Sequence, residues 1–124
     1  MNIEHITLET SDTFSTLFEK VVEVHKKLFP DATLQSQCDK FNEEFEEFKQ
    51  AEAEEDICAE FADMFIVAAG ISRFSPGLGE FIAKSMIDVP DKVQFANAIV
   101  DKMNKNIDRK WDNKNGFYKH TTIN

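Results

Sequence analysis

Apolar residues recur at steps of three and four through the first half of the chain, which is the spacing of helices that bury one face. Ser11 or Asp12 is placed to cap a first helix, and Pro30 ends it. Its apolar stripe consists of Phe14, Leu17, Phe18, Val21, His25 and Leu28. Thr33 is placed to cap a second helix. The predicted seam of that helix consists of Leu34, Cys38, Phe41, Phe45 and Phe48.

A third helix, expected over residues 57–74, differs from the first two because it is apolar on almost every side. The polar run at 51–56 is expected to form a turn or a solvated helix end before it. The sequence SPGLG at 75–79 is expected to break the third helix, and residues 80–88 then form a short helix. A helix without a polar face lies inside a protein, so we expect the third helix to be buried.

A last long helix is expected to begin at Asp88 or Pro90. Its predicted apolar face consists of Val93, Ala96, Val100, Met103, Ile107 and Trp111. Residues 112–124 are expected to form a polar tail with a tight turn at Asn115-Gly116. No strand pattern precedes this tail, and nothing repeats at a solenoid period. The chain is therefore expected to be one all-α domain, a bundle of four to five helices with its core at about 12–111.

Composition and charge narrow the class of protein. The chain has 124 residues, of which 42% are hydrophobic and 30% charged, as in a globular helical domain. A net charge of −9 argues against non-specific nucleic-acid binding, but nucleotides stay possible because metal ions neutralise phosphates. No run is long and apolar enough to span a bilayer, and the N-terminus lacks a signal-peptide core. We therefore expect a cytoplasmic protein without membrane or nucleic-acid partners, in which Cys38 and Cys58 are reduced.

Acidic side chains stand where the helix pattern predicts burial. Glu60 and Asp63 lie on the apolar third helix, where an ionised carboxylate costs several kcal/mol unless a positive charge meets it. Glu44 and Glu47 repeat the three-residue spacing beside the seam of the second helix. Two antiparallel helices would bring these carboxylates together, and a hard divalent cation would relieve their repulsion. The alternative is a solvated acidic face, which is our interpretation of Glu46, Glu52, Glu54 and Glu55.

The ligand types narrow the choice of metal. Ligands that are all oxygen favour Mg²⁺, with Mn²⁺ as a substitute, whereas a di-iron bundle needs a Glu-x-x-His motif that this sequence lacks. Because Mg²⁺ held by few protein oxygens usually awaits phosphates, cationic side chains should lie nearby. Lys102, Asn106 and Arg109 share one face of the last helix, and Lys40 lies one turn before Glu44. The alternative is that Lys102 and Arg109 only pair with surface acids or complement the C-terminal end of their helix.

The acidic residues form a pattern known from one enzyme family. Glu43-Glu44-x-x-Glu47, followed after twelve residues by Glu60-x-x-Asp63, resembles the motif of the MazG-like all-α nucleoside triphosphate pyrophosphohydrolases, relatives of the dimeric dUTPases. The resemblance covers roughly residues 33–118. Within it, the segment similar to the phosphate-contacting last helix of the family and the residues beyond contains Lys102, Asn106, Arg109, Asn115-Gly116 and Tyr118. Its R-x-W and G-x-Y arrangement is similar to that of phage-encoded members.

The resemblance implies Mg²⁺-dependent hydrolysis of a nucleoside triphosphate between the α and β phosphates, which gives the monophosphate and pyrophosphate. The implied metal ligands are Glu44, Glu47, Glu60 and Asp63. The implied phosphate-binding residues are Lys40, Lys102, Asn106 and Arg109. Glu43 would orient or deprotonate the attacking water, or else face solvent. The base would stack on Phe14, Phe18 or Trp111, unless these aromatic side chains belong to the core.

The resemblance also implies a homodimer or a dimer of dimers, for which the apolar side chains of Phe81, Ile82 and Met86 are available. A phage enzyme of this kind would adjust nucleotide pools in the host cytoplasm.

Two other functions stay open. One is a non-enzymatic acidic helical module that binds a basic partner, Mg²⁺ or Ca²⁺, and the other is hydrolysis of a different nucleotide pyrophosphate. The sequence does not determine which base is preferred, because a few hydrogen bonds decide it.

Overall fold

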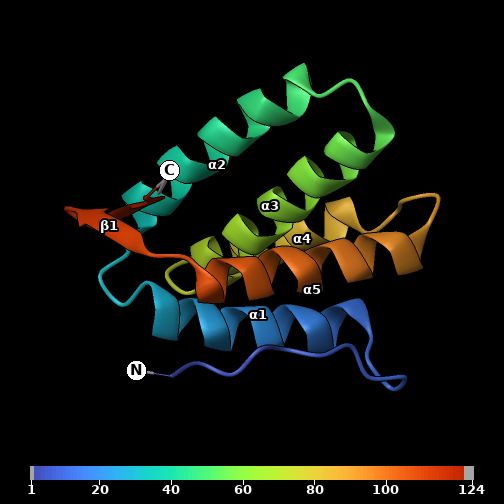
Figure 1. Cartoon of the computed structure of the whole chain (residues 1–124), viewed down its shortest axis with the longest axis horizontal. Coiled ribbons are helices and arrows are strands. Elements are labelled where there is room, and N and C mark those ends of the chain that lie inside the picture. Colours follow the sequence, from blue (N-terminus) through green and yellow to red (C-terminus); the bar gives the residue numbers. More distant parts are fainter. Residues whose placement is uncertain (1, 122–124) are drawn as a thin grey trace.

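Residues 2–121, which the computed structural model describes, form five helices followed by a two-stranded β-hairpin (Figure 1). The helices are α1 (Phe14–Leu28), α2 (Leu34–Gln50), α3 (Glu54–Ser72), α4 (Pro76–Met86) and α5 (Lys92–Asp108). The strands are β1 (Trp111–Lys114) and β2 (Phe117–His120). The predicted helical bundle is confirmed as a mostly helical fold. The predicted polar tail is wrong over 112–120, which belongs to the hairpin, and its last part, 122–124, lies outside the described residues.

Helix α3 lies at the centre of the bundle and packs against α1, α2, α4 and α5 (Figure 1). Ala62 and the run 64–71 are buried, which explains why this helix has almost no polar face. The Phe65 ring contacts those of Phe14, Phe18 and Phe95, with centroids 6.3, 5.5 and 5.8 Å away. The prediction that the third helix is buried is therefore confirmed. None of the helices among residues 2–121 is long and apolar enough to cross a membrane.

Threonine side chains fix where the first two helices begin. Thr33 caps α2, as predicted, and its hydroxyl accepts a hydrogen bond from the backbone of the first turn. Thr13 caps α1 in the same way, so the predicted caps Ser11 and Asp12 are wrong. The Asp12 carboxylate instead lies 2.7 Å from Lys20 Nζ, because both side chains face the segment that precedes α1.

Two helices begin earlier than predicted. Helix α3 starts at Glu54 rather than at residue 57, since its acidic first turn complements the positive end of the helix dipole. Pro76 is the first residue of α4, where its fixed φ suits the first helical position. Within SPGLG only Ser75 therefore lies outside a helix, because residues 76–79 belong to α4. Gly79 lies inside α4 and against α3, where an added Cβ would lie 2.6 Å from Ser72 Cα. A glycine in this helix therefore allows a close approach to the end of α3.

Helix α5 is capped by Asp91, so the predicted starts at Asp88 and Pro90 are slightly too early. Val93, which was assigned to the apolar face, is 68% exposed. The predicted apolar face is therefore displaced around the helix axis from the face that is buried. The buried face of α5 consists of Phe95, Ile99, Val100, Met103 and Asn106. Phe95 packs between aromatic rings of α1 and α3, and this packing sets the rotation of the helix.

Helix α2 turns a polar face toward α3. Leu34 and Phe45, both assigned to an apolar seam, are 39% and 41% exposed. Ser36, Gln37 and Glu44 are buried instead. The predicted seam is therefore wrong at Leu34 and Phe45, whereas Phe41 and Phe48 pack against the core. Polar residues also point inward on α2, because α2 and α3 enclose a polar cavity between them.

The β-hairpin is attached to the loop between α1 and α2. Asn115 and Gly116 have φ of 54° and 88°, so the predicted tight turn is confirmed. Asp31 N–H donates to Tyr118 Oη at 3.1 Å, and Asn113 Nδ2 donates to Asp31 Oδ2 at 2.9 Å. Strand β2 also contacts α2. These contacts place the hairpin across one end of the cavity.

Candidate functional site

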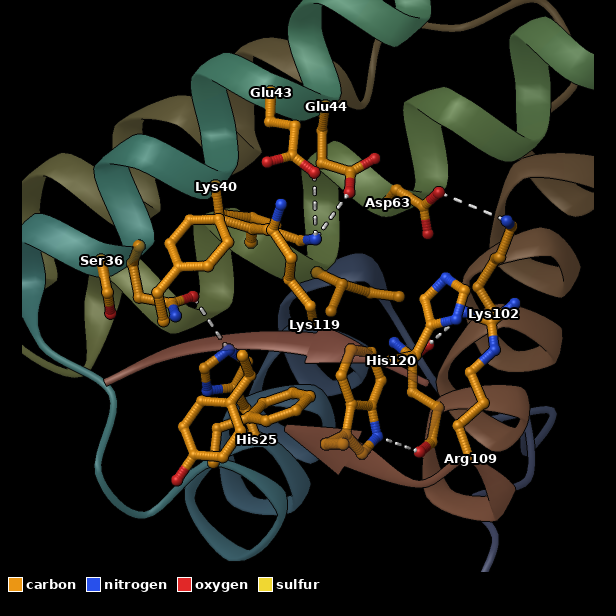
Figure 2. A pocket seen from close by; sticks show the side chains of 18 of the residues that line it. His25, Ser36, Lys40, Glu43, Glu44, Asp63, Lys102, Arg109, Lys119 and His120 are labelled. Atoms are coloured by element: carbon orange, nitrogen blue, oxygen red, sulfur yellow. Dashed lines mark hydrogen bonds and ion pairs between the residues drawn. The ribbon is translucent and has the colours of Figure 1, made fainter. Parts of the chain in front are cut away.

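A cavity of about 310 Å³ lies between α2, α3, α5 and the hairpin (Figure 2). Its size is at the lower end of the range for small-molecule pockets. Every residue predicted to bind metal or phosphate or to orient the water lines this cavity: Lys40, Glu43, Glu44, Glu47, Glu60, Asp63, Lys102, Asn106 and Arg109. Two consecutive helices, α2 and α3, and the more distant α5 thus bring the acidic and the basic residues to one place.

The acidic residues meet where α2 and α3 face each other. Carboxylate oxygens of Glu44, Glu47 and Glu60 lie within 4.8 Å of one another, a spacing at which they could share a metal ion. Asp63 lies outside this group, although it lines the same cavity. Its Oδ2 atom is 3.3 Å from Lys102 Nζ. The structure therefore brings three of the four predicted ligands together and pairs the fourth with a lysine.

Glu47 is exposed, but the carboxylates of Glu44, Glu60 and Asp63 are poorly solvated, and neighbouring carboxylates repel one another. Burial raises the pKa of Glu44 to about 8, and the negative charge of Asp63 adds to this shift. Burial is also the main cause that raises the pKa of Glu60 and of Asp63. The Oε2 atoms of Glu44 and Glu60 are buried and have no hydrogen-bond partner. Such oxygens need either a proton or a cation to offset the cost of burial.

The donor set fits a hard divalent cation. The carboxylates of Glu44, Glu47 and Glu60 supply oxygen only, and two of their oxygens lack any other partner among the described residues. Oxygen ligands of this kind suit Mg²⁺, Mn²⁺ or Ca²⁺ better than zinc or copper. A bound cation would favour the ionised form of each carboxylate and so reverse the pKa shifts.

Two lysines reach the acidic residues from different helices (Figure 2). Lys40 Nζ lies 3.6 Å from Glu43 and 3.5 Å from Glu44. Lys102, on α5, reaches Asp63 from another side. Both lysine side chains are 20% exposed, so the solvent screens these pairs less than it screens surface pairs. The cavity therefore combines unpaired acidic oxygens with positive charges that suit phosphate groups.

Arg109 and Asn106 extend the basic side of the cavity. Arg109 Nη1 donates a hydrogen bond to Asn106 Oδ1 at 3.3 Å, and the Asn106 backbone carbonyl accepts one from Trp111 Nε1 at 2.9 Å. Asn106 is buried, which holds the end of α5 against the cavity. Glu43 lies at the rim, with 39% of its side chain exposed, so it faces both the cavity and the solvent.

The aromatic side chains divide between the cavity and the core. Trp111 lines the cavity, which is the position that stacking of the base on this side chain requires. Phe14 and Phe18 do not line it, because their rings pack against Phe65 on the α1 side of the core. The prediction that the base could stack on Phe14 or Phe18 is therefore wrong for this cavity.

Several lining residues were not predicted from the sequence. Gln37 precedes Lys40 by three residues and Glu44 by seven, so helical spacing alone could have placed it on the same face. Lys119 and His120 come from the hairpin, whose only signal was the Asn-Gly turn. His25, which the sequence places on the apolar stripe of the first helix, is buried, hydrogen-bonded and part of the lining.

Comparisons of this chain with protein families, with curated proteins and with solved structures found no match. The resemblance of the acidic motif to the MazG-like enzymes therefore stays a prediction.

Proposed function

We propose that this protein is a Mg²⁺-dependent nucleoside triphosphate pyrophosphohydrolase of the MazG-like kind. In the proposed reaction, water adds across the anhydride between the α and β phosphates and gives a nucleoside monophosphate and pyrophosphate. The observation that carries the proposal is the pair of buried, unpartnered oxygens on Glu44 and Glu60, within a cavity that also holds lysine and arginine. A triphosphate substrate needs a divalent cation and positively charged groups for its phosphates. The acidic residues can bind the cation, and the basic residues beside them can bind the phosphates.

The proposed metal ligands are Glu44, Glu47 and Glu60, together with Asp63. When bound, Mg²⁺ would neutralise negative charge on the carboxylates and on the phosphates. The proposed phosphate-binding residues are Lys40, Lys102, Asn106 and Arg109. Glu43, at the rim of the cavity, is proposed to accept a hydrogen bond from the attacking water and to orient it.

The enclosed position of the acidic residues favours an enzyme over an interaction module. An acidic face that binds a basic protein should be exposed, whereas Glu44 is only 7% exposed and Asp63 lies at the wall of a cavity. Lys40 and Lys102 within the same cavity would also repel a basic partner. Hydrolysis of another nucleotide pyrophosphate uses the same groups, and substrate profiling separates it from the proposed activity.

The test is to incubate the protein with each ribo- and deoxynucleoside triphosphate and to measure pyrophosphate and monophosphate. We expect both products in equal amounts with Mg²⁺ or Mn²⁺ and neither product with excess EDTA. If no triphosphate is turned over, the proposed function is wrong. Release of a diphosphate and inorganic phosphate would contradict cleavage between the α and β phosphates.

Replacement of Lys102 by methionine is expected to raise KM about 10- to 100-fold, because a charge-assisted hydrogen bond to phosphate contributes about 1.5–3 kcal/mol. Methionine keeps the length of the side chain and removes its charge. Steady-state kinetics with the best triphosphate would measure the effect. Lys105→Met is the matched control, because Lys105 is exposed on the same helix and does not line the cavity. Equal KM values for the two variants would contradict the role proposed for Lys102.

Exposed apolar side chains support the proposal of a homodimer or a dimer of dimers. Phe81 is 70% exposed and Val93 is 68% exposed, and a second copy of the chain could cover them. Met86 is buried in its own subunit and so is not available for such a contact. The proposed activity would place the protein among the enzymes that control nucleotide pools.

A further inference from the structure

The end of the cavity near the hairpin contains a chain of hydrogen bonds that starts at Arg73. Arg73 Nη1 donates to the Phe29 carbonyl at 2.8 Å and lies 3.0 Å from His25 Nδ1. A guanidinium group can only donate, so Nδ1 must accept this hydrogen bond. The proton of the neutral His25 ring is therefore on Nε2. Burial, together with the charge of Arg73, lowers the pKa of His25 to about 3, which agrees with a neutral ring.

The histidine in turn fixes the orientation of the Gln37 amide. His25 Nε2–H donates to Gln37 Oε1 at 3.0 Å, which places the amide oxygen toward the histidine. Gly70 on α3 makes room for this pair, because an added Cβ would collide with Gln37 Oε1 and with the His25 ring. The two N–H groups of Gln37 therefore point away from His25.

The Gln37 NH₂ group has no hydrogen-bond partner among residues 2–121, although Gln37 is only 5% exposed. Among the described residues, the only buried side-chain nitrogen or oxygen atoms without a hydrogen-bond partner are oxygens of Glu44 and Glu60. The NH₂ group must therefore be accessible, and Gln37 lines the cavity. The Ser36 hydroxyl beside it is already committed, because it donates to the Thr33 carbonyl and accepts from the Thr33 N–H. Gln37 thus offers two donors to whatever occupies this end of the cavity.

Aromatic rings form much of the wall at this end. The Phe29 ring lies 4.8 Å from Trp111, 5.0 Å from Tyr118 and 4.8 Å from the neutral His25 ring, measured between centroids. The carboxylates of Glu44 and Asp63 lie away from His25 in another part of the same cavity, together with Lys102 (Figure 2). This arrangement suits a ligand with a charged end and a flat aromatic end.

We propose that this end receives the base of the nucleotide and that Gln37 selects bases with a carbonyl oxygen over bases with an amino group at the same position. The inference rests on the proposed function, because it assigns the part of the substrate that the phosphate site does not hold. An amino group facing the Gln37 donors leaves the donors on both sides without an acceptor in the complex, and such mismatches discriminate between substrates. His25 and Arg73 act as positioning residues, since they determine which side of the amide faces the base.

The test compares substrates that differ at one position of the base, dUTP with dCTP and dITP with dATP. We expect kcat/KM to be about tenfold or more higher for the carbonyl member of at least one pair. Gln37→Glu offers only acceptors and should reverse that ratio, whereas Gln37→Met should bring it close to one. Arg73→Met should lower the ratio while Gln37 is still present, because His25 can then change tautomer and the amide can turn. A residue that only supported the fold would change both members of a pair equally.

A wild-type ratio near one in both pairs, or a Gln37→Glu variant that keeps the preference for the carbonyl base, would overturn the inference. If circular dichroism shows that Gln37→Glu does not fold, the kcat/KM ratio measured with Gln37→Met tests the inference instead. Calorimetric binding of dUMP, dCMP, dIMP and dAMP supplies a readout that needs neither metal nor cleavage. Absence of any turnover would refute the proposed function alone, and equal affinities within both monophosphate pairs would refute the role of Gln37 alone.

Discussion

Replacement of Glu60 by glutamine is expected to lower Mg²⁺-dependent pyrophosphate release by about 1,000-fold. The amide has nearly the same size but carries no charge, and its NH₂ group cannot bind a metal ion. Loss of the charge stabilisation that a metal ion gives to phosphates, worth several kcal/mol, corresponds to about three powers of ten in rate. The fold should persist, because Glu60 is only half-buried and repels Asp63 and Glu47 in the metal-free protein.

Three measurements check this expectation. Initial rates of pyrophosphate release give the change in activity, calorimetric titration with Mg²⁺ gives the change in metal affinity, and circular dichroism shows whether the fold is intact. Glu46→Gln is the matched control, because Glu46 is exposed on α2 and pairs only with Lys49 at the surface. A Glu60→Gln variant with the wild-type rate would show that the acidic cluster is not the metal site.

The metal-free protein is expected to lose about 2 kcal/mol of its free energy of unfolding as the pH rises from 6.5 to 8. Glu44 has a pKa of about 8 in the folded protein against an ordinary value of 4.5, so the folded state binds the extra proton between these values. Stability falls with rising pH wherever the folded state binds more protons. Below pH 6.5 the buried His25 acts in the opposite direction, because its pKa falls from 6.5 to about 3 on folding. The decrease should therefore be clear only above pH 6.5.

Urea denaturation at several pH values from 6 to 8.5 would measure this decrease. Saturating Mg²⁺ should abolish it, because a cation that binds the ionised carboxylates stabilises the folded state instead. The Glu44→Gln variant should show a smaller decrease even without metal, since its amide does not titrate and, of the cavity carboxylates, only Glu60 and Asp63 keep a raised pKa. A decrease of the same size in Glu44→Gln and in the wild type would show that another group is responsible.

Local features of the sequence predicted much of the fold. Thr33 as a cap and Asn115-Gly116 as a turn depend on a few neighbouring residues, and both are confirmed. The rotation of α2 depends on what surrounds it and was predicted only in part, since Phe41 and Phe48 pack against the core but Leu34 and Phe45 are exposed. Its apolar and polar residues repeat at the same helical period, so the pattern alone could not show which of the apolar residues would be exposed.

The hairpin could not be predicted for a related reason. Its strands are only four residues long and are largely polar, so they carry no clear alternation. Its position depends on contacts of Asn113 and Tyr118 with Asp31, which is far away in the sequence. The charged residues that α2, α3 and α5 contribute to the cavity were therefore found from the sequence, whereas Lys119 and His120 were not.

The connection between α2 and α3 has a consequence for the recognition of relatives. Residues 51–53 join the two helices that carry the acidic pairs, and no residue from 48 to 59 lines the cavity. Each doubling of the length of a flexible loop costs only about 0.6 kcal/mol. Evolution can therefore lengthen this link without moving Glu47 or Glu60. A profile for distant homologues should keep the three-residue step within each pair and allow gaps of any moderate length between the pairs.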